Sequence, residues 1–189
     1  MTRDRSSLGS GLKLVAFFSL ILIPVVLVLG PLRETFYPPA AAQAAALADL
    51  TPPDFDQFAL GDGDEAWRAT RASLRDAYER GQPAVVTALL ERLADVPSPQ
   101  GVLLLEGVCY LLQRRPGPAL IRLQQIQQPS RERHAAWYTA QCHLILGQPR
   151  DARSVLVALT SADDPVAARA RRQLQELDEL LSHRKEGTP

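Results

Sequence analysis

The chain is poor in the residues that build catalytic and metal sites. Its 189 residues include three histidines and two cysteines, and none of them has zinc-ligand spacing or lies in a nucleophile motif. No glycine-rich loop follows a strand-like run, so a nucleotide-binding loop is not indicated. Two cysteines in a chain of this length do not make a disulfide framework. The sequence therefore predicts no catalytic residue, no cofactor and no metal, and it does not predict an enzyme.

Neither sign of charge is in excess. Lys and Arg number 21, as do Asp and Glu, and the 17 bases and 13 acids after residue 65 are interleaved. A nucleic-acid surface needs a dense basic stripe, so we expect no nucleic-acid partner. One segment is strongly of one sign, because residues 49–65 carry six acids and no base.

One apolar run is long enough to cross a membrane. Residues 14–32 contain no charge, and at 1.5 Å per residue a helix of this length measures about 28 Å, close to the thickness of a bilayer core. Three bases precede the run and one follows it closely, so the positive-inside rule places residues 1–13 in the cytoplasm. We expect a single-pass transmembrane helix in the inner membrane of a bacterial cell, with the rest of the chain in the periplasm.

A cleaved signal peptide is the competing interpretation of this run. A basic start precedes it, and an Ala-rich stretch at residues 40–48 resembles a cleavage region. However, the run exceeds the 7–15 apolar residues typical of a signal, and the Ala-rich stretch begins only about eight residues beyond it. An uncleaved anchor is therefore favoured.

The next stretch, residues 33–63, is rich in Pro, Ala, Asp and Gly. Pro52 and Pro53 end any short helix across the Ala-rich region, and the acidic part behind them has Phe55, Phe58 and Leu60 as its only large apolar residues. This composition predicts a flexible linker. The alternative left open is that the two phenylalanines dock on the first repeat.

Residues 64–182 repeat with a fixed period. Pro83, Pro116 and Pro149 are 33 residues apart. Proline is tolerated in the first turn of a helix, so each is expected to start one. Small or apolar residues recur in step with them: Leu74, Gly107 and Ala140; Val86, Ala119 and Ala152; Leu90, Leu123 and Leu156; Leu93, Ile126 and Leu159.

These positions predict an all-α domain of about three helix pairs, followed by a capping helix over residues 166–181. Gly81 and Gly147 are expected to end first helices, and Cys109 and Cys142, one period apart, to be small buried residues. Four further prolines are expected between units: Pro97, Pro99, Pro129 and Pro165. Residues 183–189 are expected to form a disordered tail.

The pattern resembles the tetratricopeptide repeat family over about 115 residues, 67–181. The matching residues of the second and third units are Gly107, Tyr110, Ala119 and Leu123, and then Ala140, Gly147, Ala152, Leu156 and Pro165. The period departs from the usual family value of about 34. The first unit also has Leu74 and Val86 where the family has small residues. The resemblance implies a superhelical array whose first helices line a groove.

The resemblance also implies which residues bind a partner. The family's groove positions correspond here to Arg68, Arg71, Arg75, Tyr78, Leu104, Val108, His134, Trp137 and Gln141. The three arginines share one helix face and suit an acidic or carboxylate-ended peptide. A solvated charged face is the plainer interpretation of the same stripe.

The layout is similar to single-pass tetratricopeptide proteins that accompany the secretory translocon or envelope-assembly machinery. We therefore expect a membrane-anchored scaffold or adaptor that binds proteins on the periplasmic side. The alternatives are a regulatory membrane protein, like those of sigma-factor control, and lastly an enzyme subunit. A second copy of the chain stays open as a partner.

Overall fold

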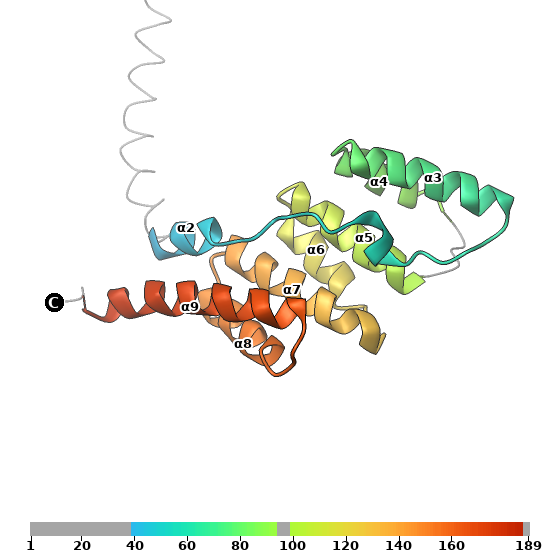
Figure 1. Ribbon diagram of the computed structural model, residues 1–189. Coiled ribbons are helices and arrows are strands. Elements are labelled where there is room, and N and C mark those ends of the chain that lie inside the picture. Colours follow the sequence, from blue (N-terminus) through green and yellow to red (C-terminus); the bar gives the residue numbers. More distant parts are fainter. Residues whose placement is uncertain (1–38, 94–98, 187–189) are drawn as a thin grey trace, which may run out of the picture. The chain divides into compact units, whose positions relative to one another are not determined.

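The structure is a computed structural model that describes residues 39–93 and 99–186 (Figure 1). The expected cytoplasmic tail, the expected transmembrane helix at residues 14–32 and the end of the chain lie outside these residues. The described elements are α2 Pro39–Ala46, the 3-10 helix η1 Phe55–Phe58, α3 Glu65–Glu79, α4 Pro83–Leu90, α5 Pro99–Leu112, α6 Pro116–Leu123, α7 Pro129–Ile145, α8 Pro149–Leu159 and α9 Pro165–Glu186. Within the described ranges no strand occurs, which confirms the all-α prediction.

Two findings concern the ends of the chain. Among the described helices, none combines the length and the hydrophobicity that a bilayer crossing requires. The last helix, α9, continues to Glu186, so the expected disordered tail begins too early. Residues 183–186, which were expected to be disordered, are helical.

Proline starts every helix from α4 to α9. Pro83, Pro116 and Pro149 stand at the first helical positions, as the period predicts. Pro99 and Pro129, expected between units, instead begin α5 and α7, and Pro165 likewise begins α9. The physical reason is the same at all six helices, because the first turn of a helix has no partner for the N–H that proline lacks.

The helices that precede the three periodic prolines end in one repeated geometry. Gly81, Arg114 and Gly147 have left-handed backbone, with φ of 67°, 58° and 68°. Each N–H bonds back to the carbonyl three residues earlier, and the following N–H bonds five residues back. Glycine adopts this conformation without steric cost, so Arg114 is the one strained member of the set.

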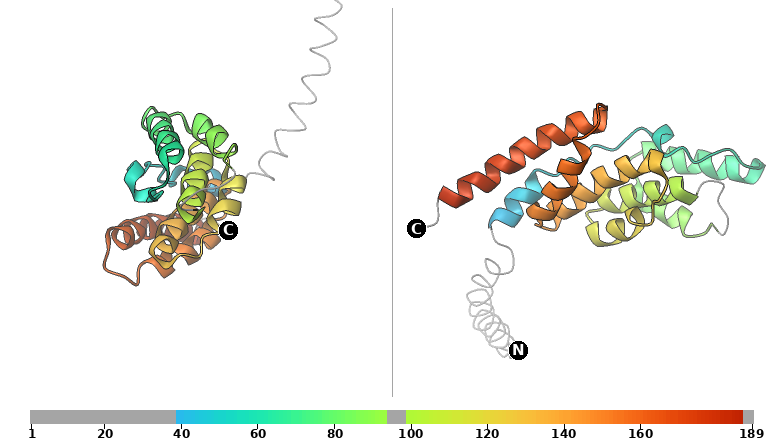
Figure 2. Two further views of the ribbon diagram at one scale, coloured as in Figure 1. Left: turned by 90° about the vertical axis from the view of Figure 1, so that its right-hand side faces the viewer. Right: turned by 90° about the horizontal axis from the view of Figure 1, so that it is seen from below.

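Helices pack in consecutive pairs, and each pair packs on the next (Figure 2). The pairs are α3 with α4, α5 with α6, and α7 with α8, and α9 closes the series against α8 and α7. The second helices contribute the predicted apolar stripe to the core. Its buried members are Val86, Leu90, Ala119, Leu123, Ile126, Ala152, Leu156 and Leu159.

Close backbone approach accompanies this packing at Gly107 of α5. A Cβ built on Gly107 would lie 2.8 Å from two side-chain atoms of Leu123 in α6. A real Cβ does not tolerate such a distance, so the small residue lets the two helices of the pair approach. The equivalent position in the next unit is the buried Ala140.

Candidate functional site

The stretch between α2 and α3 contacts the first helices of the pairs and α9 (Figure 1). We call residues 47–62 the resident segment. Phe55, Phe58 and Leu60 are 5, 0 and 1% exposed. The expected flexible linker is therefore wrong for residues 39–63, and the alternative in which the phenylalanines dock describes them. The reason is that their apolar area finds a core to join, which composition alone does not reveal.

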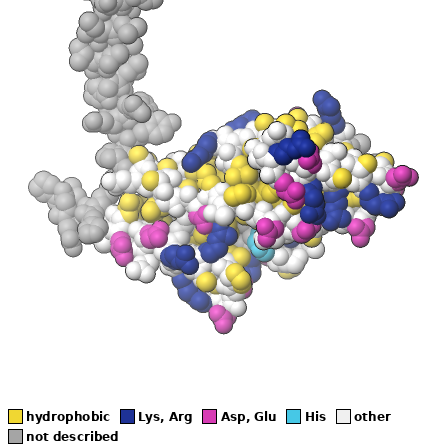
Figure 3. All heavy atoms as spheres, turned by 45° about the horizontal axis from the view of Figure 1, so that its top comes forward, with side chains coloured by type: hydrophobic (Ala, Val, Ile, Leu, Met, Phe, Trp, Pro, Cys, Tyr) yellow, Lys and Arg dark blue, Asp and Glu magenta, His cyan; other side chains and the backbone are white. Residues whose placement is uncertain are grey.

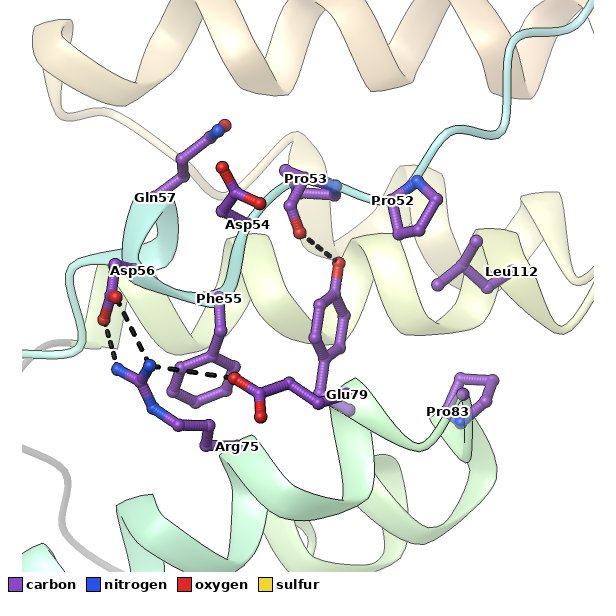
Figure 4. A pocket seen from close by; sticks show the side chains of 12 residues that line it. Pro52, Pro53, Asp54, Phe55, Asp56, Gln57, Arg75, Glu79, Pro83 and Leu112 are labelled. Carbon is purple, nitrogen blue, oxygen red and sulfur yellow. Dashed lines mark hydrogen bonds and ion pairs between the residues drawn. The ribbon is translucent and has the colours of Figure 1, made fainter.

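An aromatic cluster holds the middle of the resident segment against α3. The ring of Tyr78 lies 5.8 Å from that of Phe55 and 5.3 Å from that of Phe58, between ring centroids. The Tyr78 hydroxyl donates to the carbonyl of Pro53 at 2.9 Å (Figure 4). Burial raises the pKa of Tyr78 above its ordinary value, so the hydroxyl stays a donor throughout the physiological range.

Arginines pair with the acids of the resident segment. Arg75 of α3 forms an ion pair with Asp56 and lies over the ring of Phe55 at 5.0 Å. Arg71 contacts Asp62 at 3.1 Å. At the other end of the segment, Arg169 of α9 contacts Asp49 at 2.7 Å. The three arginines that contact the resident segment thus carry charge opposite in sign to its aspartates.

Two of these pairs shift the pKa of a partner. Burial alone would raise the pKa of Asp49, but hydrogen bonds from Arg169 and Thr51 outweigh it, and the pKa is lowered. A hydrogen bond to Asp56 raises the pKa of Arg75. Both shifts favour the charged forms that attract each other.

Side chains of the groove also bind the backbone of the resident segment. Gln141 accepts from the N–H of Asp49 at 2.9 Å. Carbonyl oxygens of the segment accept four further bonds: Leu47 from Gln173 at 2.8 Å, Ala59 from Arg131 at 2.7 Å, and Gly61 from Trp67 at 3.2 Å and from Arg71 at 3.3 Å. Such contacts fix an extended chain without depending on its side chains.

The structure separates the nine predicted site residues into groups. Arg71, Arg75, Tyr78 and Gln141 hydrogen-bond the resident segment. Leu104 and Val108 are buried in α5, on which η1 packs. His134 is half-buried, and this burial lowers its pKa. Arg68 is exposed. Partner binding by these residues stays a prediction.

Trp137 is buried rather than presented at an open groove. It is 2% exposed, and the guanidinium of Arg169 lies over its ring at 4.5 Å. Its indole N–H has no hydrogen-bond partner within the described part of the chain. This contrasts with Trp67, whose indole N–H donates to Gly61 of the segment.

Sequence reasoning missed four residues that bind the resident segment: Trp67, Arg131, Arg169 and Gln173. Arg169 and Gln173 lie on α9, which the family pattern treats as a cap without groove positions. The basic and amide side chains that recur along this helix can be seen in the sequence, but the neighbouring residues do not indicate which segment they contact.

A cavity of about 960 Å³ lies between the resident segment and helices α3 to α5 (Figure 4). Its wall includes Pro52, Pro53, Phe55, Tyr78 and Leu112 as apolar parts. Arg75, Asp56 and Glu79 form its charged rim. The segment therefore covers the groove without filling it.

Other site chemistry is sparse in the described ranges. No group of three or more His, Cys, Asp or Glu residues there is placed to hold a metal ion. Cys109 and Cys142 are buried free thiols, and burial raises the pKa of each to about 12. On the face in Figure 3, basic and acidic side chains are interspersed.

No protein-family model, curated protein or solved structure matches the chain. Function is therefore argued from the groove and its contents.

Proposed function

We propose that the chain is a membrane-anchored scaffold or adaptor whose groove holds an extended segment of another protein. One observation carries this proposal. The groove wall already binds residues 47–62 of the chain through backbone hydrogen bonds, ion pairs and an aromatic cluster. A surface that seats one extended segment in this way has the chemistry to seat another.

The 33-residue period and the consecutive helix pairs support a tetratricopeptide-type array, in which first helices line the binding groove. The apolar run at residues 14–32 and the bases before it support an anchor in the inner membrane, with the helical domain in the periplasm. We propose a role in envelope assembly or translocation because this layout resembles that of single-pass proteins in those systems.

Site-specific photo-crosslinking in native membranes tests the binding proposal. A photoreactive amino acid in place of Leu112, which lines the cavity, should give adducts with a partner. The control is the same group in place of Val157, an exposed residue of α8. Adducts should disappear when Arg71 and Arg75 are changed to Gln. The proposal would be overturned if substitutions at Arg122 or Arg153 of the second helices abolished partner binding while substitutions in the groove did not affect it.

Membrane topology is tested separately. Protease added to intact spheroplasts should digest the helical domain and leave a small membrane-bound fragment, because the domain is proposed to be outside the cytoplasm. Recovery of a soluble mature form starting near residues 44–48 would contradict the anchor.

A further inference from the structure

The resident segment shows which chemistry the groove accepts. We propose that the groove selects an acidic segment in which one 3-10 turn carries two aromatic residues three positions apart, the pattern of Asp-Phe-Asp-Gln-Phe at residues 54–58, and that such a partner binds by displacing the resident segment. This inference rests on the proposed function and names the class of partner.

The aromatic spacing follows from the local backbone. Phe55 and Phe58 lie in η1, and in a 3-10 helix residues three apart point to the same side. Both rings therefore reach Tyr78 together, at 5.8 and 5.3 Å between centroids. A partner with only one aromatic residue, or with a different spacing, would leave part of this site empty.

The charges select acids over bases. Arg71, Arg75 and Arg169 each contact an Asp of the resident segment, and residues 49–65 carry no base. A basic segment would face these arginines with like charge, and it would offer no acid to replace the three aspartates. Of its acidic partners in the described residues, Arg75 would keep only Glu79 of the same helix. Ordinary apolar segments would satisfy the aromatic site but not the arginines.

Two prolines before the aromatic pair favour the bound conformation. Asp54, directly after Pro52 and Pro53, has φ of −61° and ψ of 142°, which is close to polyproline II backbone. A proline fixes its own φ and biases the residue before it toward extended backbone, so Pro52 and Pro53 restrict residues 51–53 before binding. A proline-containing partner would therefore lose less conformational freedom when it binds.

The resident segment fits the groove incompletely, which is why it can be displaced. The cavity of about 960 Å³ lies beside Pro52, Pro53 and Phe55. Asp56 and Asp62 pair with arginines although their side chains remain 68 and 97% exposed. A partner that fills the cavity would make contacts that the resident segment lacks.

Covalent attachment works in favour of the resident segment. A tethered ligand acts at an effective concentration on the order of mM, so it suppresses binding of a free peptide to the wild-type chain. Weakening the resident segment should therefore reveal the affinity of the groove. This sets the design of the experiment.

The probe is a fluorescent synthetic peptide with the sequence of the resident segment, residues 47–62, added to the full-length chain in detergent. Two variants weaken the resident segment: Phe55→Ala with Phe58→Ala, and the charge reversal Asp56→Lys with Asp62→Lys. We expect the peptide to bind both variants at least about tenfold more tightly than wild type, because the internal competitor is weakened. Fluorescence anisotropy measures the affinities.

Matched peptides and groove variants test the chemistry. A scrambled peptide, and one with both Phe changed to Ala, should bind at least about tenfold more weakly. Replacing the Asp residues by Asn should weaken binding and reduce its salt dependence. In the weakened backgrounds, Arg75→Gln should lose affinity, whereas Arg80→Gln should not, since Arg80 pairs with Asp76 on its own helix.

The outcomes separate the two proposals. If a scrambled or a basic peptide binds as tightly as the probe, the groove does not select acidic segments with two aromatic residues. The proposal that the groove binds peptides would still stand. Binding of none of the peptides to folded variants would overturn both proposals. If both variants lose cooperative unfolding by circular dichroism and no peptide restores it, the segment is a permanent part of the core, and displacement is wrong.

Discussion

Gln141 of α7 and Gln173 of α9 each donate an amide N–H to the side-chain oxygen of the other, at 2.8 and 2.9 Å. Both are buried. The same two side chains bind the backbone of Asp49 and Leu47. Two helices and the resident segment are thus joined through one amide pair, whose buried groups are paired as burial requires.

Breaking this amide pair should destabilise the protein. Gln141→Ala removes the donor to the Gln173 side-chain oxygen and the acceptor of the Asp49 N–H, so we expect the free energy of unfolding to fall by about 1–3 kcal/mol. Changing both glutamines to Leu should cost less than the sum of the single changes. Urea unfolding followed by circular dichroism measures this. Gln175→Ala, at an exposed position of α9, is the control; strictly additive costs would contradict the pairing.

Gly107 and Leu123 should show coupled effects on stability. Leu123→Ala is expected to cost about 2–5 kcal/mol as a buried large-to-small change. Gly107→Ala is expected to cost about 1–3 kcal/mol, because its Cβ would meet Leu123 at 2.8 Å. In the double variant the smaller side chain makes room, so the combined cost should be well below the sum. Gly117→Ala, where nothing lies within 4 Å, should not destabilise; a Gly107→Ala variant as stable as wild type would refute the close approach.

Arg114→Gly should stabilise the protein. Arg114 has φ of 58°, a conformation that costs a side-chain-bearing residue about 1 kcal/mol or more. Glycine relieves this strain, and the equivalent Gly81 and Gly147 already do so. A rise in the unfolding midpoint checks the change, with Arg115→Gly at a negative φ as the control. Equal effects of the two substitutions would argue against strain at Arg114.

The two thiols should be unreactive in the folded protein. Burial raises the pKa of Cys109 and of Cys142 to about 12, so almost no thiolate is present at pH 8. Iodoacetamide should therefore label neither residue until denaturant unfolds the domain, as mass spectrometry would show. Rapid labelling of the native protein would place a cysteine at the surface.

Stability should decline in acid partly through Asp49. The pKa of Asp49 is lowered in the folded state below its ordinary value, so its stabilising contribution is present above the unfolded pKa and is lost as pH falls through the folded pKa. We expect docking of the resident segment to weaken below about pH 4, and Asp49→Asn to flatten this part of the pH dependence. Fluorescence of Trp67 and Trp137 during urea unfolding at several pH values tests this. If the free energy of unfolding of the variant falls with decreasing pH as steeply as that of wild type, Asp49 does not have this role.

Helix positions and the buried stripe could be predicted because their signals are local. A proline at a helix start, a glycine at a helix end and apolar residues three or four apart act over one or two turns. Repetition with a period of 33 residues then indicated that Leu123 and Leu156 face a neighbouring unit, and both are buried.

The contents of the groove were decided by tertiary structure. The contacts that hold the resident segment join residues 92, 120 and 126 positions apart, from Asp49 to Gln141 and Arg169 and from Leu47 to Gln173. A Pro-rich acidic stretch has the local propensities of a loop, and only the shape of the folded helices supplies apolar and basic partners for it. The same reason explains Trp137, since a helix face predicted from the sequence does not show what covers it.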